Sequence, residues 1–116
     1  MLDWKAIAMS LKFLGKSTTG NQSPTLYLGD SDYVVQGWRV TDHPELIEIP
    51  HALLAYLEAG TCLGVVLTDT GHGTFTLTGE PIRDPDVLAE MDIPDHEAGV
   101  TVPVGQEIRP DVAASR

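Results

Sequence analysis

Short stretches in which apolar and polar residues alternate dominate this chain, and one pattern occurs twice. Tyr33-Val34-Val35-Gln36-Gly37 has a counterpart in Phe75-Thr76-Leu77-Thr78-Gly79. Each copy leads to an apolar-polar-apolar-Pro tetrad, first Ile47-Glu48-Ile49-Pro50 and then Val100-Thr101-Val102-Pro103. Alternation is typical of strands with one buried face. The pattern predicts a mainly β or α+β fold: a small antiparallel sheet from two similar strand-turn-strand units, with one or two short helices.

Turn-forming residues between the alternating stretches predict two hairpins. The first joins a strand at residues 25–28 to one at 33–40 through Gly29-Asp30-Ser31-Asp32. The second joins residues 63–67 to 74–78 through a Gly-rich tip at 68–73. Within each repeated unit, Gly37 or Gly79 is expected to form a turn, and Asp42 or Asp84 a bend beside a proline.

Two segments have the spacing of short helices. Residues 4–11 follow Asp3, a suitable N-terminal cap, and Leu53, Leu54 and Leu57 form an apolar stripe after Pro50. Gly60 is expected to end the second helix. At 116 residues with 42% apolar content, the chain is expected to be a single domain, 1–116, with a possible internal repeat (25–59 and 74–108) and a frayed tail at 110–116.

Charge is distributed unevenly around a net value of -10. All but one of the 17 acidic residues lie from Asp30 onward, where Arg39, Arg83, Arg109 and Arg116 are the only Lys or Arg residues. Such a surface repels a phosphate backbone and attracts a basic protein. The composition therefore predicts a protein partner rather than direct binding to nucleic acid, and it leaves the oligomeric state open.

Targeting signals are not apparent in the sequence. The first 15 residues lack a signal-peptide pattern, and no run of 18 apolar residues predicts a membrane span. Cys62 is the single cysteine, which permits no internal disulfide. These features favour a cytoplasmic protein that does not contact membranes.

The turn Asp69-Thr70-Gly71-His72 is the segment that most resembles catalytic chemistry. It follows an apolar stretch, as the Asp-Thr-Gly triplet of aspartic proteases does. Asp69 and His72 are also weak candidates for two metal ligands, which would need Asp95 or His96 to complete a site. A turn that uses Asp and Gly for their backbone tolerance is the favoured interpretation, so no catalytic residue, metal or cofactor is predicted.

Aromatic and charged residues near the end of the first unit suggest a binding surface. Tyr33, Trp38, Arg39 and Asp42 are the predicted partner-binding residues, because Trp, Tyr and Arg are enriched at interface hot spots. The competing interpretation places Trp38 in the core between sheet and helix.

Residues 12–60 resemble a known family. They contain Lys16-Ser17-Thr18 before a Gly/Asn loop, Val34-Val35, then Arg39, Asp42 and Pro44, and the tetrad that ends at Pro50. In this order they resemble the small actinobacterial proteins of unknown function encoded beside helix-turn-helix regulators. The resemblance implies an accessory partner that restrains a DNA-binding regulator.

Together these features predict a non-enzymatic acidic accessory protein that binds and modulates a protein partner, and the resemblance implies that this partner is a helix-turn-helix transcription regulator. Two alternatives stay open. One is a hydrolase or metal-dependent enzyme that uses the Asp69 turn, and the other is a structural or virion-associated self-assembling module.

Overall fold

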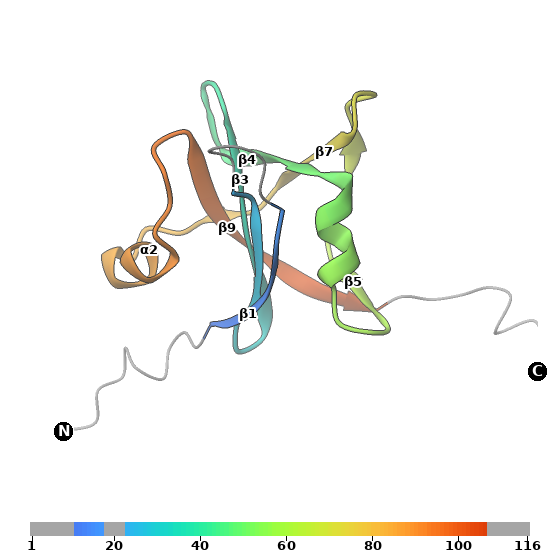
Figure 1. Cartoon of the computed structure of the whole chain (residues 1–116), viewed down its shortest axis with the longest axis horizontal. Helices are drawn as coiled ribbons and strands as arrows, with labels where there is room; N and C mark the ends of the chain where they lie inside the picture. Colours follow the sequence, from blue (N-terminus) through green and yellow to red (C-terminus); the bar gives the residue numbers. More distant parts are fainter. Residues whose placement is uncertain (1–10, 18–22, 107–116) are drawn as a thin grey trace, which may run out of the picture.

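A computed structural model describes residues 11–17 and 23–106 of the chain. In chain order its elements are β1 Lys12–Lys16, β2 Thr25–Leu28, β3 Asp32–Val40, β4 His43–Pro50, the 3₁₀ helix η1 His51–Tyr56, β5 Thr61–Leu63, β6 Thr68–Asp69, β7 Thr74–Thr78, β8 Glu80–Pro81, α2 Pro85–Met91 and β9 Glu97–Gln106. Every pairing is antiparallel, and the described residues form two short helices (Figure 1). The predicted fold class is confirmed.

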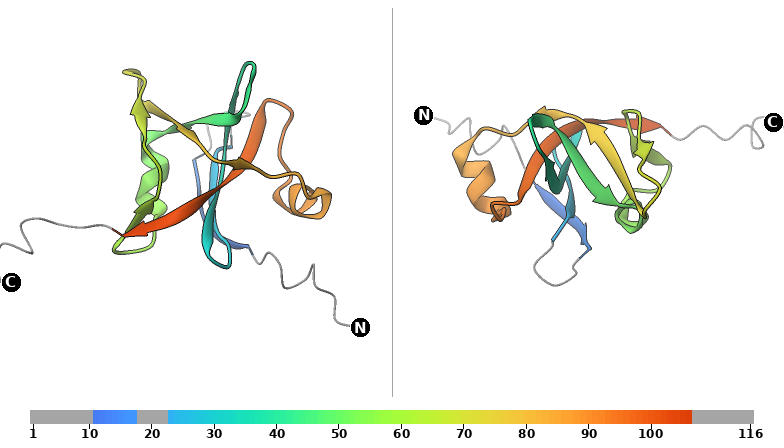
Figure 2. Two further views of the ribbon diagram at one scale, coloured as in Figure 1. Left: turned by 180° about the vertical axis from the view of Figure 1, so that it is seen from behind. Right: turned by 90° about the horizontal axis from the view of Figure 1, so that it is seen from above.

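Strand β3 organises the sheet because it pairs with three others. Its first half lies between β2 and β9, whereas its last residues pair with β4. Neighbouring strands in the sheet follow the order β1-β2-β3-β4-β7-β6. After β7 the chain passes through Gly79 into β8, which lies off this path and pairs with β9. The strands therefore bend around a common interior, as the view from above shows (Figure 2).

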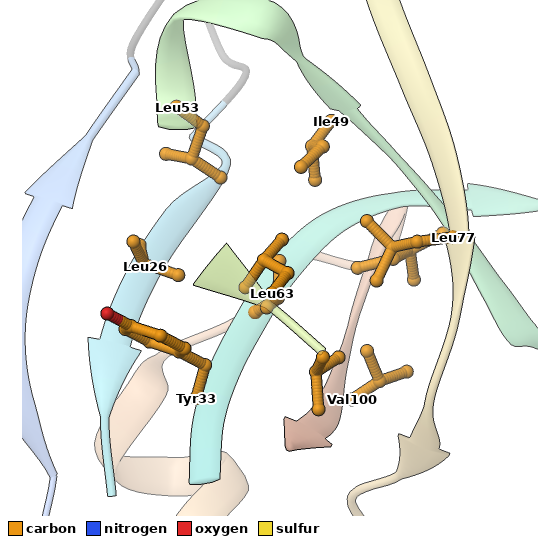
Figure 3. Close-up of a cluster of buried hydrophobic side chains, with 10 residues drawn as sticks. Leu26, Tyr33, Ile49, Leu53, Leu63, Leu77 and Val100 are labelled. Carbon is orange, nitrogen blue, oxygen red and sulfur yellow. The ribbon is translucent and has the colours of Figure 1, made fainter. Parts of the chain in front are cut away.

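The main core is the set of apolar side chains on the inner face of this bent sheet (Figure 3). Its buried members are Leu26, Tyr33, Val35, Ile47, Ile49, Leu53, Leu63, Leu77, Val100 and Val102. Ile47 and Ile49 alternate with the half-buried Glu48, and Val100 and Val102 with Thr101, as the two predicted tetrads require. Both tetrads are confirmed as strand segments.

A smaller cluster lies on the other face of β3 and consists of Val34, Val87 and Met91. Val87 and Met91 come from α2, whereas η1 contributes Leu53 to the main core. The two helices therefore lie on opposite sides of the β3–β9 pair, and both views of the ribbon agree (Figures 1 and 2).

The first hairpin forms as predicted. β2 and β3 pair from Thr25–Gln36 to Leu28–Tyr33, and the Gly29 amide donates to the Asp32 carbonyl at 2.7 Å. The second hairpin is shorter than predicted, because its first strand, β6, pairs with β7 through Thr68 and Asp69 alone. Leu63 belongs to β5, which pairs with β9, so the predicted strand at 63–67 is wrong.

The helix after Pro50 is confirmed, with a 3₁₀ rather than an α-helical geometry. It ends at Tyr56 with Leu57 as its C-cap, instead of the predicted Gly60, and its buried residue is Leu53. The Tyr56 ring lies directly over Gly15 of β1, where a Cβ atom would collide with it. This contact holds η1 against the edge strand. The predicted helix at 4–11 and the tail at 110–116 fall largely or wholly outside the described residues.

Helix α2 is absent from the sequence prediction, which placed a bend there. The Asp84 side chain accepts a hydrogen bond from the Asp86 amide at 2.9 Å, and Pro85 occupies the first turn. Asp followed by Pro is a common helix start, because the side chain binds a free amide and proline has none to leave unpaired. The same residues therefore fit a helix as well as a bend.

The two repeated segments have different surroundings. β3 leads through a turn at Asp42 directly into β4, whereas α2 separates β8 from β9. Gly37 lies inside β3, so the turn predicted there is wrong. Gly79 does separate two strands, β7 and β8.

Neither helix in the described part of the chain has the length and apolar character needed to cross a membrane.

Candidate functional site

Two adjoining cavities, of about 270 and 330 Å³, form a groove at the end of β3. Both are lined by Arg39, Pro44 and Ala98, and we call them together the Arg39 groove. The remaining lining residues are Val40, Thr41, Asp42, His43 and Leu46 in one cavity, and Pro81, Ile82, Arg83, Leu88, Ile93, Pro94, Asp95, Glu97 and Gly99 in the other. Apolar side chains predominate, and charged groups lie among them.

Arg39 is held in place by the segment that leads into β9. Its amide donates to the His96 carbonyl at 3.0 Å, and its Nε donates to the Asp95 carbonyl at 2.8 Å. Fixing Nε orients the planar guanidinium, whose other N–H groups can bind a carboxylate or a carbonyl. Asp42 lines the same groove from the β3–β4 turn, where its φ is +68°. Two of the four predicted partner-binding residues therefore meet here.

Tyr33, the third predicted partner-binding residue, is not a surface residue in this fold. Its side chain is fully buried in the main core. The hydroxyl lies 2.5 Å from Thr61 Oγ1 and accepts from the Glu58 amide at 2.8 Å. A buried tyrosine hydroxyl needs such partners, and here they connect β3 to the loop after η1.

Trp38 is half-buried and lines neither cavity of the groove. Successive residues of a strand point to opposite faces of the sheet, so Trp38 and Arg39 cannot share one surface. Trp38 lies opposite Glu48 on one neighbouring strand and Glu97 on the other. The Trp and Arg pair that looks contiguous in sequence is thus divided by the sheet.

Asp69 and His72 are close in sequence but take different partners. Asp69 Oδ1 accepts from the Gly71 amide at 2.9 Å and lies 3.4 Å from His51 Nε2. His72 Nε2 lies 3.2 Å from Glu48 Oε2. Among the described residues, no group of three or more His, Cys, Asp or Glu side chains is arranged to hold a metal ion. The geometry does not join the two predicted metal ligands in one site.

The surroundings of Asp69 stabilise its ionised form. The Gly71 amide, and after it the charges of His51 and His72, hold the pKa of Asp69 below its ordinary value, although partial desolvation opposes them. A lowered native pKa adds stability that is present above the unfolded pKa of about 3.9 and is lost as pH falls through the folded pKa.

Asp69→Asn tests this contribution, because Asn retains the acceptor for Gly71 but not the charge. We expect the variant to be slightly less stable than the unmodified protein at pH 7, and the difference in urea midpoint to vanish as pH falls through the folded pKa. Asp30→Asn, at an exposed position in another turn, is the matched control. A difference independent of pH would show that the charge of Asp69 has no such role.

A buried polar pair lies beside the groove. Glu97 is fully buried, accepts from Gln36 Nε2 at 2.7 Å and from the Ser23 amide at 2.8 Å, and lies 3.3 Å from His96 Nε2. The Gln36 amide also donates to the Ser23 carbonyl at 3.0 Å. These bonds link β3 and the start of β9 to the segment before β2. They therefore stabilise the position of the residues just before β9, Asp95 and His96, whose carbonyls bind Arg39.

Most groove residues were not identified from sequence. Ile82, Leu88 and Ile93 lie around α2, which was not predicted, and Ala98 belongs to a strand whose first residues precede the recognised tetrad. The Asp84-Pro85 helix start was the available signal for this part of the groove.

No protein-family model matches this chain, and no curated protein or solved structure shows significant similarity to it.

Proposed function

We propose that this chain is a non-enzymatic acidic accessory protein that binds a protein partner, and that the partner is a basic helix-turn-helix regulator. The Arg39 groove is the observation that carries this proposal. It combines apolar side chains with an oriented arginine and with the carboxylates of Asp42 and Asp95. Apolar contacts surrounded by polar groups, with arginine as an anchor, are typical of protein interfaces.

The net charge of -10 supports a basic partner. An acidic protein accelerates the association of a basic one, and salt weakens that attraction because it screens charges beyond about 8 Å at physiological ionic strength. The partner should therefore be retained at low salt and released at high salt.

The test is to purify the tagged protein from its native host at low and high salt and identify the proteins that accompany it. We expect a helix-turn-helix protein that is retained at low salt, and at least tenfold weaker binding for Arg39→Glu, as for an interface hot spot. Lys12→Glu, which reverses an exposed cation outside the groove, should change binding by less than threefold. Recovery of the protein with only itself at both salt concentrations would contradict the proposal and favour self-assembly.

A further inference from the structure

A second surface, on the α2 side of the sheet, has the chemistry to bind a cation. Phe13 of β1 and Tyr27 of β2 are cross-strand neighbours whose ring centroids are 6.2 Å apart at an interplanar angle of 75°. Phe13 is 59% exposed, a high fraction for a large apolar side chain. An aromatic ring that is both exposed and held by an edge-to-face neighbour leaves surface available for a ligand.

Carboxylates at the C-terminal end of α2 complete this surface. Tyr27 packs against the cluster of Val34, Val87 and Met91. Met91 is buried there, while its neighbours Glu90 and Asp92 are exposed. The two carboxylates therefore belong to the segment against which Tyr27 packs. We call Phe13, Tyr27, Glu90 and Asp92 the Phe13 patch.

The hydroxyl of Tyr27 responds to these charges. Burial first, and then the charges of Glu90 and Asp92, raise the pKa of Tyr27 above its ordinary value. Both carboxylates thus act on the Tyr27 side of the aromatic pair. A ligand cation placed among them would offset this negative potential.

The lysines of β1 do not provide that cation. Lys12 lies on the η1 side, where its Nζ is 3.7 Å from Glu58 Oε2. Lys16 is paired with Thr25 at the other end of the strand. The ring of Phe13 and the carboxylates beside Tyr27 therefore combine two features that favour a cation: an aromatic face and nearby negative charge.

We propose that the Phe13 patch binds a lysine or arginine side chain in a basic segment of the partner protein. This inference rests on the proposed function for the existence of the partner, and it adds a second contact surface on the face of β3 opposite the main core. The charge complementarity selects the occupant, because an acidic or purely apolar segment would leave Glu90 and Asp92 without a counter-charge.

An octa-arginine peptide is a suitable probe, since arginine keeps its charge even where tyrosine ionises. Its dissociation constant is measured by calorimetry with the full chain at 0.15 M salt. Phe13→Leu, which keeps an apolar side chain but removes the ring, should weaken binding by about threefold. Glu90→Gln with Asp92→Asn should weaken it by about fivefold. Asn is suited to position 92 because it tolerates the left-handed backbone there, where φ is +54°.

Glu45→Gln with Asp69→Asn is the matched control, since it removes the same charge from β4 and β6, away from β1 in the sheet order. Less than twofold weakening is expected. Equal weakening by both double variants, or unchanged binding by Phe13→Leu, would overturn the proposal, because either would show attraction by net charge alone.

A spectrophotometric titration gives a local readout of binding at the patch. The peptide should lower the pKa of Tyr27, and an unchanged pKa of Tyr27 would also contradict binding at the patch.

The regulator experiment separates this inference from the proposed function. If Arg39→Glu releases the natural partner while the patch variants bind both peptide and partner normally, the proposal that the Phe13 patch binds the partner is wrong and the proposed function stands. If the patch binds the peptide but no basic protein is recovered from the host, the proposed function fails and the patch remains a cation-binding surface.

Discussion

Gly37→Ala is expected to lower the free energy of unfolding by about 3 kcal/mol, at the upper end of the cost of overpacking a core. Gly37 of β3 lies directly against Glu48 and Ile49 of β4. A Cβ atom there would stand 2.6 Å from the Glu48 carbonyl oxygen and 2.8 Å from Ile49 Cγ2. The oxygen belongs to the backbone of a paired strand, so it cannot move aside as a flexible side chain could. Urea unfolding followed by circular dichroism measures the loss.

Gly60→Ala provides the comparison for this prediction. Gly60 has a φ of +76° and nothing within 4 Å of the position of a Cβ atom, so its replacement costs only backbone strain. We expect a loss of about 1 kcal/mol there. Equal losses at the two positions would show that β4 relaxes away from β3, and that the close approach does not constrain the sheet.

Gln36→Leu is expected to destabilise the protein by about 1 to 3 kcal/mol, the usual cost of leaving a buried polar group without its hydrogen-bond partner. Glu97 is fully buried, and the Gln36 amide is one of its two close hydrogen-bond donors. Glu97→Leu should also be destabilising, since it removes the acceptor used by Gln36 and by the Ser23 amide. Glu80→Gln, at an exposed ion pair, is the control and should change stability by less than about 1 kcal/mol.

The double variant decides whether the two side chains act as a pair. Leucine at both positions removes the carboxyl group together with the side-chain amide that binds it, and only the Ser23 backbone groups lose their hydrogen-bond partners. The loss of stability should therefore be well below the sum of the two single losses. The free energies of unfolding in urea of the unmodified protein, the two single variants and the double variant supply the cycle. Additive losses would mean that Gln36 and Glu97 contribute independently, and that the carboxylate is stabilised chiefly by Ser23 and His96.

The Arg39 groove and the Phe13 patch are centred on different strands and both reach the α2 region. The groove forms where β3, β4, the start of β9 and Leu88 of α2 meet, and the patch lies across β1, β2 and the end of α2. A partner that contacts both would cover two ends of the β3 strand. Each contact can be removed without replacing a residue of the main core, so binding and folding can be tested separately.

Local sequence determined much of the fold. The alternation of Ile47 and Ile49 with Glu48 specifies a strand with one buried face, whatever lies against it. Gly29 to Asp32 fixes the first hairpin because those residues suit a tight turn between two strands. The apolar stripe after Pro50 likewise specified a short helix, although not its 3₁₀ geometry. These features depend on neighbours a few positions apart, and such patterns are visible in one chain.

Tertiary structure decided which side chains share a surface. Trp38 and Arg39 are adjacent in sequence, but their side chains point to opposite faces of the sheet because β3 is pleated. Tyr33 is buried in the main core. Asp69 and His72 are three positions apart, yet each contacts a residue from the β4–η1 segment instead of the other. Phe13 and Glu90 belong to one patch only because α2 packs against the sheet beside Tyr27. The sequence by itself therefore determined the strands with clear alternation, the first hairpin and the acidic character, because those follow from local residues and composition. The groove and the patch depend on contacts between distant segments, which only the folded chain brings together.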